Sequence, residues 1–407
     1  MISHEQPLFL SKRLELIKPS PTLAVSNKAK DLKSQGKDVI DLGAGEPDFD
    51  TPEHIKQAAF DAIKSGKTKY TAVDGILDLK RAIIKKLIDE NGLEYQPEQI
   101  TVGCGAKHVL FNVFAATLNP GDEVIIPAPF WVSYPDMTLI NGGLPVIVTT
   151  KAENNFKITP EELEKNITNK TKWLVINSPN NPTGFYYTAE ELQMLAKVLD
   201  KHPHVNIISD AIYEHIRYGG EAYVNIANIS DDMKARTFVV NGVSKTYSMT
   251  GWRIGYGAGN KELVKAISKI QSQSTSNPCS ISQYASVEAL SKNSAEFIEQ
   301  SKKRFEERCN LVIGLLKNIR GITTPYPNGA FYIFPSCEQL IGKRTQNGRI
   351  INDDSDFADY LLEEALVAVV PGIAFGTKNF FRISYATSEE LLKEACARIK
   401  LACDKLS

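Results

Sequence analysis

Residues of types that can act in catalysis stand near the ends of consecutive strands expected in the middle of the chain. Lys245 lies just past an apolar strand that ends in the turn Asn241–Gly242, and Arg253 follows eight residues later. Asp210 ends the preceding strand, and Tyr213 follows three residues on. Each has an ordinary explanation alone, such as a surface charge for Lys245 or a helix N-cap for Asp210. Together they offer an amine, a carboxylate, a phenol and a guanidinium at one edge of a sheet.

Two further loops contain groups that can bind an anion or hydrogen-bond a ligand. The sequence NSPNNPTG at 177–184 follows an apolar strand, and it contains Asn181 just before a proline. Taken alone, this sequence indicates only a turn. The sequence TVGCGAKHVLFNVF at 101–114 predicts a strand, a glycine loop and a helix whose first amides can hold a phosphate. The loop is not a dinucleotide fingerprint, because His108 stands where the third glycine would fall.

These groups together are the set that a phosphorylated pyridine aldehyde requires. Its phosphate needs amides and an arginine, and its ring nitrogen needs a carboxylate that keeps the nitrogen protonated. Its phenolic oxygen needs hydrogen bonds, and its aldehyde needs a lysine amine. The residues therefore predict pyridoxal 5′-phosphate (PLP) as the cofactor.

Alternating strands and helices must position these residues. Amphipathic stretches such as 188–202 lie between several short apolar segments. This alternation predicts an α/β fold with a mainly parallel sheet covered by helices on both faces. Ligands of such sheets bind outside the carboxyl ends of the strands. The expected strands are 99–103, 122–127, 144–150, 172–179, 205–210, 237–242 and 254–259.

The rest of the chain predicts a smaller α+β domain. A long helical stretch at 292–320 precedes several short apolar segments and a final helix. We expect a large domain of residues 46–295. The small domain would join the N-terminal segment, 1–45, to the C-terminal part, 296–407.

Composition restricts the class of partner. The 407 residues include 47 basic and 48 acidic side chains, which argues against nucleic acid or an anionic membrane as the main partner. We find no apolar run of membrane-spanning length and no secretory signal. The six cysteines form no CxxC pair, which predicts a reduced, cytoplasmic protein. The pair His202 and His204 is too little to predict a metal site, so none is expected.

The order of the motifs resembles a known family. The sequences NSPNNPTG, SDAIYEH, SKTYSMTGWRIGY and FFRISYATSEE follow one another as in class I aminotransferases, PLP enzymes of fold type I. The resemblance extends over nearly the whole chain, and it is closest to bacterial-type aspartate aminotransferases, including those described as aspartate/prephenate aminotransferases. It implies ping-pong amino transfer between aspartate or glutamate and oxaloacetate or 2-oxoglutarate, with prephenate as a further substrate.

The resemblance also implies site residues. Lys245 matches the Schiff-base lysine, which also carries the proton during catalysis. The residues that match cofactor-binding positions are Tyr70, Gly105, Ala106, Lys107, Trp131, Asn181, Asp210, Tyr213, Ser244, Lys245 and Arg253. The expected substrate-binding residues are Lys18, Gly45, Trp131, Asn181 and Arg382.

Individual roles follow from the same matches. Asp210 is the partner of the ring nitrogen, Arg253 binds the phosphate, and Arg382 forks onto the substrate α-carboxylate. Asn181 and Tyr213 are ligands of the phenolic oxygen. Trp131 stacks on the cofactor ring, and Lys107 contributes its backbone amide, with its side chain in solvent. Tyr70 matches a tyrosine that reaches the phosphate of the neighbouring subunit, which implies a homodimer.

Two positions depart from the family pattern or need a separate hypothesis. Gly242 stands where many relatives have a serine that donates to the phosphate, and Ser244 is the hydroxyl that can replace it. The second carboxylate of a dicarboxylic substrate needs a cation, and we expect Lys18 to supply it as a flexible point charge.

Other functions on the same fold remain open at this stage. A carbon–sulfur lyase would keep the lysine, aspartate and arginine, and so would an aminotransferase of aromatic or neutral amino acids. A non-catalytic PLP-binding regulator is disfavoured, because no DNA-binding helix-turn-helix precedes the PLP domain.

Overall fold

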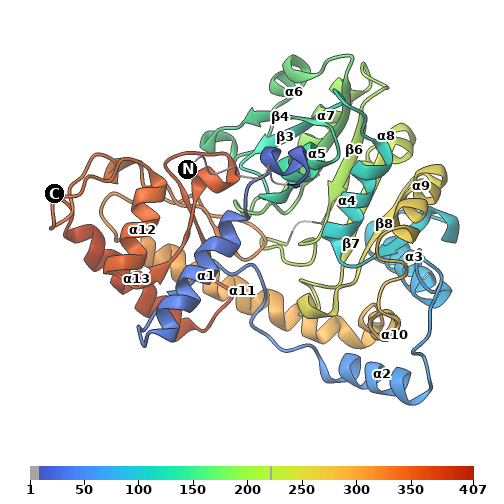
Figure 1. The fold of residues 1–407 in the computed structure, drawn as a ribbon, viewed down its shortest axis with the longest axis horizontal. Coiled ribbons are helices and arrows are strands. Elements are labelled where there is room, and N and C mark those ends of the chain that lie inside the picture. The colour runs from blue at the N-terminus through green and yellow to red at the C-terminus, as the bar shows by residue number, and fades with distance from the viewer. Residues whose placement is uncertain (1–8, 221) are drawn as a thin grey trace, which may run out of the picture.

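A seven-stranded sheet forms the centre of the larger part of the molecule (Figure 1). The structure is a computed structural model that describes residues 9–220 and 222–407. Across the sheet, the strands are β2 Ile100–Gly103, β8 Gly255–Ala258, β7 Thr237–Gly242, β6 Asn206–Asp210, β5 Thr171–Asn177, β3 Glu123–Ala128 and β4 Leu144–Thr149. Only β8 within this sheet runs antiparallel to its neighbours. All seven expected strands therefore form, and the predicted α/β fold class is confirmed.

Strand β5 shows why these segments are apolar at nearly every position. Its side chains alternate between two cores: Trp173 and Val175 pack into one, while Leu174 and Ile176 pack into the other. Since both faces are covered by helices, both sets of side chains are buried. The helices of this part are α2 Glu53–Lys64, α3 Leu77–Asn91, α4 Ala106–Thr117, α5 Ser133–Ile140, α6 Pro160–Asn166, α7 Ala189–Leu199, α8 Asp231–Arg236, α9 Lys261–Ser272 and α10 Ser280–Ala289.

Local sequence signals fix where several helices begin. Helix α7 starts with a capping box, in which the Thr188 hydroxyl accepts from the Glu191 amide and the Glu191 carboxylate accepts from the Thr188 amide. This exchange satisfies two backbone donors that a helix start leaves without partners. Helix ends of this kind set the length of the connections that return the chain to the sheet.

The N-terminal segment and the C-terminal part pack together beside the sheet (Figure 1). Strand β1 Ile40–Asp41 pairs in parallel with β10 Val367–Ala368, and helix α1 Pro21–Ser34 contacts both. A second small sheet is antiparallel, with the order β11 Val370–Pro371, β12 Phe381–Ser384 and β9 Tyr332–Ile333. The remaining helices are α11 Ala295–Leu316, α12 Asp354–Glu364 and α13 Glu389–Asp404.

The sequence predicted a small domain that joins the N-terminal and C-terminal segments. The division at residues 45/46 and 295/296 itself stays a prediction, and residues 1–8 of the expected small domain lie outside the described residues. Among the helices that the structure describes, none combines the length and the apolar character needed to cross a membrane.

Candidate active site

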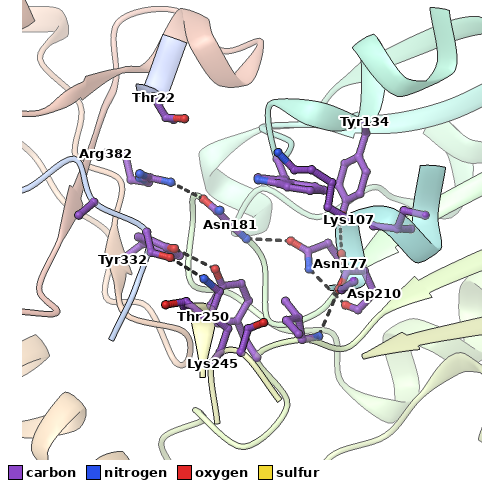
Figure 2. A pocket seen from close by; sticks show the side chains of 18 of the residues that line it. Thr22, Lys107, Tyr134, Asn177, Asn181, Asp210, Lys245, Thr250, Tyr332 and Arg382 are labelled. Atoms are coloured by element: carbon purple, nitrogen blue, oxygen red, sulfur yellow. Dashed lines mark hydrogen bonds between the residues drawn. The ribbon is translucent and has the colours of Figure 1, made fainter. Parts of the chain in front are cut away.

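A cavity of about 300 Å³ lies at the carboxyl edge of the parallel strands, where the two parts of the molecule meet (Figure 2). Its wall brings together most of the residues selected from the sequence. Those residues are Gly45, Ala106, Lys107, Trp131, Asn181, Asp210, Tyr213, Ser244, Lys245, Arg253 and Arg382. The volume and the mixture of apolar walls with convergent polar groups are typical of a small-molecule site.

Three selected residues do not line this cavity. Gly105 lies directly behind it as the N-cap of α4, and Tyr70 projects from the surface with 91% of its area exposed. Lys18 is exposed and lies beside Asp136, before α1 begins. Helix α1 instead presents Thr22, Leu23 and Ser26 to the cavity. Lys18 itself lies outside this cavity wall, and its role as the cation for a second substrate carboxylate stays a prediction.

Lys245 stands on the loop after β7 and points into the cavity. Its ammonium donates a 2.5 Å hydrogen bond to the backbone oxygen of Gly45, from the N-terminal segment. The pKa of Lys245 is lowered to about 8, mainly by burial and also by Arg382 and Arg253, while Glu46 and Asp210 act in the opposite direction. A lysine with a lowered pKa is a better nucleophile and proton carrier near neutral pH.

Asp210 ends β6 at the floor of the cavity, with 4% of its surface exposed. The Tyr134 hydroxyl donates to one carboxylate oxygen at 2.6 Å, and the Ile212 amide donates to the other at 3.2 Å. Burial raises the pKa of Asp210 to about 6, although Tyr134, Ile212 and Lys245 favour the ionised form. The site therefore holds a carboxylate that needs a further positive partner to remain ionised.

Asp210→Asn is expected to change how the stability of the cofactor-free protein depends on pH. A folded-state pKa near 6, above the usual value of 3.8 for aspartate, means that folding favours the protonated acid. Wild-type stability should therefore fall as pH rises from about 4 to above 6, by on the order of 3 kcal/mol, and the asparagine variant should lack this fall. Urea unfolding of both proteins between pH 4 and pH 8 measures the difference. Parallel stability curves for the two proteins would contradict the pKa assignment.

The end of the cavity formed by Arg253 and the start of α4 carries groups that can bind an anion. Arg253 donates to the backbone oxygens of Thr250, at 2.7 Å, and Cys104, at 3.2 Å. A Cβ atom at Gly105 would lie 2.2 Å from the Arg253 guanidinium, and the φ angle of Gly105 is +91°. Only glycine therefore lets this arginine approach the start of α4, where the first amides lack intrahelical partners. Arginine and helix amides converge as a phosphate group requires.

A side chain at Gly242, where many relatives have a serine, would be tightly packed. A Cβ atom there would lie 3.0 Å from both Gly255 Cα and the Ile254 oxygen, on the neighbouring strand. Ser244 is buried and lines the cavity. Its proposed contact with a phosphate stays a prediction.

Arg382 lies across the cavity from the strand ends, on β12. Its terminal nitrogens donate to Asn181 Oδ1 at 2.8 Å and to the Gly43 oxygen at 2.6 Å. Its guanidinium also lies 4.5 Å from the centroid of the Tyr332 ring. Within the described part of the chain, the buried Arg382 Nε finds no hydrogen-bond partner. A buried guanidinium with a free donor is suited to an anionic ligand.

Two tyrosines of the site were not selected from the sequence. Tyr134 holds Asp210, and Tyr332 places its hydroxyl 2.8 Å from that of Tyr213. The sequence clue to Tyr134 is its position three residues after Trp131, which places the two side chains close together. In the structure their rings meet edge to face, with centroids 5.2 Å apart. Tyr332 belongs to the apolar segment GAFYIFPS at 329–336, which contributes β9 to the small antiparallel sheet.

The residues present fit PLP. A buried carboxylate, a lysine with a lowered pKa, an arginine beside a helix start and a second arginine with a free donor share one cavity. Together with the mainly parallel α/β sheet, they define a PLP-dependent enzyme of fold type I. The chain belongs to the family of class I and II aminotransferases, whose model matches residues 37–399. Enzymes of this family use PLP, and the protein is an aminotransferase.

Named relatives cover nearly the whole chain. The aspartate/prephenate aminotransferase of Cereibacter sphaeroides is 56% identical over 98% of this chain and 100% of its own length. The crystal structure of the Rhizobium meliloti aspartate aminotransferase has a TM-score of 0.95 and 52% identity, covering 98% of this chain and 99% of that one. The Thermus thermophilus aspartate aminotransferase solved with maleate has a TM-score of 0.91 and 44% identity, covering 97% and 99%.

Proposed function

We propose that the protein transfers the amino group between aspartate or glutamate and oxaloacetate or 2-oxoglutarate, and that prephenate also accepts the amino group. The observation that carries this proposal is that Lys107 lines the cavity as a further cation, besides Arg382 and the two residues assigned to the cofactor, Lys245 and Arg253. A dicarboxylic substrate needs two positive partners, one for each carboxylate. The names of the Cereibacter and Rhizobium relatives support the choice of substrates.

Lys107 is a better placed candidate for the second cation than Lys18. Its ammonium lies 5.0 Å from the centroid of the Trp131 ring, at the cavity wall. Burial and the nearby Arg253 lower its pKa, which indicates a cation that gains from an anionic partner. The side chain is exposed, as the sequence predicted, and it also lines the cavity, where it can meet a substrate carboxylate.

PLP, when bound, supplies an electron sink that allows the Cα–H bond of an amino acid to be broken. Arg382 would bind the α-carboxylate and so fix the orientation of the substrate against the opposite wall. Lys245 would take the proton from Cα and return it at the cofactor carbon, which its lowered pKa favours near neutral pH.

Other residues would hold the charges and exclude water. Asp210 would hold the proton on the cofactor ring nitrogen, and Tyr134 would keep that carboxylate oriented. Tyr213 and Asn181 would donate to the phenolic oxygen. Their burial, 3% and 6% exposed, keeps bulk water from competing for those hydrogen bonds.

Lys107→Ala is expected to raise KM for aspartate and 2-oxoglutarate by about fivefold to tenfold, because one partly exposed ion pair is lost. KM for alanine, which lacks the second carboxylate, should stay near the wild-type value. Steady-state kinetics with all three substrates measure this. Lys18→Ala is the matched control, and a larger effect in that variant would favour the assignment made from the sequence.

A panel of donors and acceptors tests the proposed reaction. Aspartate, glutamate, alanine and phenylalanine are each combined with oxaloacetate, 2-oxoglutarate, pyruvate and prephenate, and amino acid products are separated and quantified. The highest kcat/KM is expected for the dicarboxylic pairs. Release of pyruvate and sulfide from cysteine without amino transfer would instead support the carbon–sulfur lyase alternative.

We propose further that the active unit is a homodimer. Tyr70 is strongly exposed and lies outside the cavity of its own chain, as a residue directed at a partner's site would be. Light scattering of the purified holoenzyme should give about twice the 45.1 kDa mass of the chain. A fully active monomer would contradict the proposal.

A further inference from the structure

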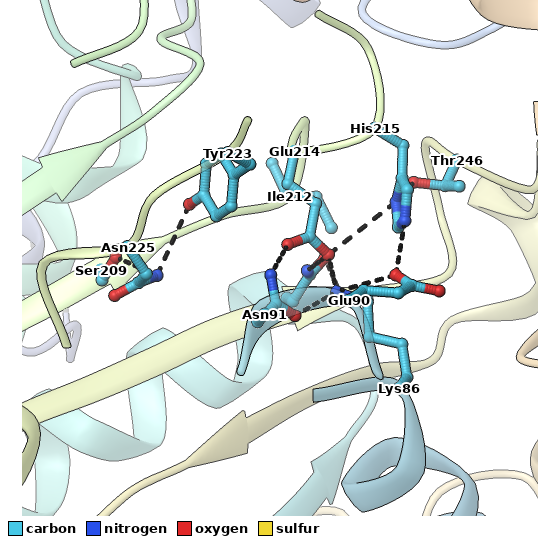
Figure 3. A network of polar contacts seen from close by, with 12 residues as sticks. Lys86, Glu90, Asn91, Ser209, Ile212, Glu214, His215, Tyr223, Asn225 and Thr246 are labelled. Carbon is cyan, nitrogen blue, oxygen red and sulfur yellow. Dashed lines mark hydrogen bonds and ion pairs between the residues drawn. The ribbon is translucent and has the colours of Figure 1, made fainter. Parts of the chain in front are cut away.

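A network of ionic and hydrogen-bonded side chains joins the loop after β6, with Glu214 and His215, to the loop after β7, with Thr246 (Figure 3). Glu214, directly after Tyr213, forms an ion pair with Lys86 of α3, and the side chains are 4% and 2% exposed. Asn241 of β7 donates to Glu214 at 2.6 Å, and Asn91 donates to it at 2.8 Å. Burial alone would raise the pKa of Glu214, but Lys86 and the other partners bring the pKa down to about 2. Glu214 is therefore a permanent anion between the two loops.

The second branch of the network runs through His215. Its Nε2 lies 2.8 Å from a Glu90 carboxylate oxygen, and its Nδ1 lies 3.1 Å from the hydroxyl of Thr246. A carboxylate only accepts, so Nε2 carries a proton. In the neutral ring Nδ1 then accepts from Thr246, the residue next to Lys245. One hydrogen bond therefore joins the network directly to the lysine loop.

The same cluster is not a metal site. Glu90, Glu214 and His215 offer ligand atoms within 4.8 Å of one another. However, the Lys86 ammonium is bonded to Glu214 and lies 3.4 Å from Glu90, where it supplies the positive charge that a metal ion would otherwise bring. Lys86 therefore occupies the position between the two carboxylates and balances one of their charges.

We propose that Glu214 and His215 are positioning residues for Lys245, acting through Asn241 and Thr246. Neither Glu214 nor His215 nor Thr246 is among the described residues that line the cavity, so none of them contacts a ligand there. The network instead fixes the loop after β6, with Asp210 and Tyr213, relative to the loop after β7. A group that moves a proton between two atoms has to be held within about 0.5 Å of its working position. This inference rests on the proposed role of Lys245.

Thr246→Val and Thr246→Ser form the pair of variants that tests it. Valine keeps the shape of threonine and removes the hydroxyl, while serine keeps the hydroxyl. As purified holoenzymes, the valine variant should show a kcat about tenfold lower with little change in KM. The pH midpoint of the cofactor's absorption band in the resting enzyme should also shift, by about half a unit or more. Thr246→Ser should match the wild type in both measurements.

Glu214→Gln, compared with Glu164→Gln, provides a second test. Glu164 is also paired with a lysine, Lys201, but lies exposed at the surface. Only the Glu214 variant should shift the midpoint and lower kcat, and if it does not fold, the Thr246 pair decides alone. Wild-type midpoint and kcat in Thr246→Val, or equal losses in the valine and serine variants, would overturn the positioning role. A wild-type protein without any borohydride-reducible absorption band would instead refute the assignment of Lys245 and with it both proposals.

Discussion

Lys245→Ala is expected to lose nearly all amino transfer, with kcat at least about 10⁴-fold below the wild type. The variant removes both the amine that holds the cofactor aldehyde and the base that moves the proton. Arg253 and the start of α4 remain, so PLP should still bind, but without a covalent link. Half-reactions of the purified holoenzyme with aspartate, followed by absorbance, measure the loss.

Peptide mapping after borohydride reduction provides the decisive control for this prediction. Reduction of the wild-type holoenzyme should attach the cofactor to the peptide that contains Lys245, and the variant should give no labelled lysine. Lys261→Ala, at the start of α9, is a suitable control because Lys261 lies outside the cavity wall. A label on any other lysine of the wild type would show that the assignment is wrong.

Arg382→Ala is expected to lower kcat/KM by about 10²-fold to 10⁴-fold for every amino acid substrate, monocarboxylic and dicarboxylic alike. Hydrogen bonds to a charged group contribute about 1.5–3 kcal/mol each, and a guanidinium offers two of them to one carboxylate. The effect should not depend on the substrate side chain, because the α-carboxylate is common to all substrates. Steady-state kinetics with aspartate, glutamate and alanine measure this.

Arg382→Lys distinguishes the contribution of the paired guanidinium hydrogen bonds from that of the positive charge. A lysine keeps the positive charge but presents no planar pair of donors, so only part of the activity should return. PLP affinity should stay near the wild-type value in both variants, whereas Arg253→Ala should weaken it. An Arg382→Ala enzyme with unchanged kcat/KM on all three substrates would exclude the role.

The central sheet could be predicted from the sequence because its strands are buried on both faces. Each appears as a short, nearly continuous apolar run, such as the one that contains Trp173 and Ile176. Since parallel strands end at one edge, the polar residues after them could also be expected to meet. Asp210, Lys245 and Asn181 do line one cavity.

Contacts between the two parts of the molecule could not be predicted in this way. Tyr332 reaches Tyr213 from a strand of the small antiparallel sheet, across 119 residues of chain. The sequence also did not indicate which face of α1 turns towards the cavity. Thr22 and Ser26, four residues apart on one helical face, line the cavity, whereas Lys18 does not. Sequence spacing determines which residues share a face, but the packing of the helix determines which face turns inward.

Because β8 runs antiparallel to β7, the connection between these two strands begins and ends at the same edge of the sheet. Gly242 and Gly255 are paired partners in the sheet, so residues 243–254 leave and re-enter it at the same edge. Within this excursion stand both Lys245 and Arg253, which would hold the aldehyde and the phosphate of one cofactor molecule. Connections at the rim of a sheet ordinarily tolerate added or lost residues. In this connection the number of residues sets the distance between Lys245 and Arg253. A single inserted residue would therefore change that distance, so that the two residues no longer match the cofactor.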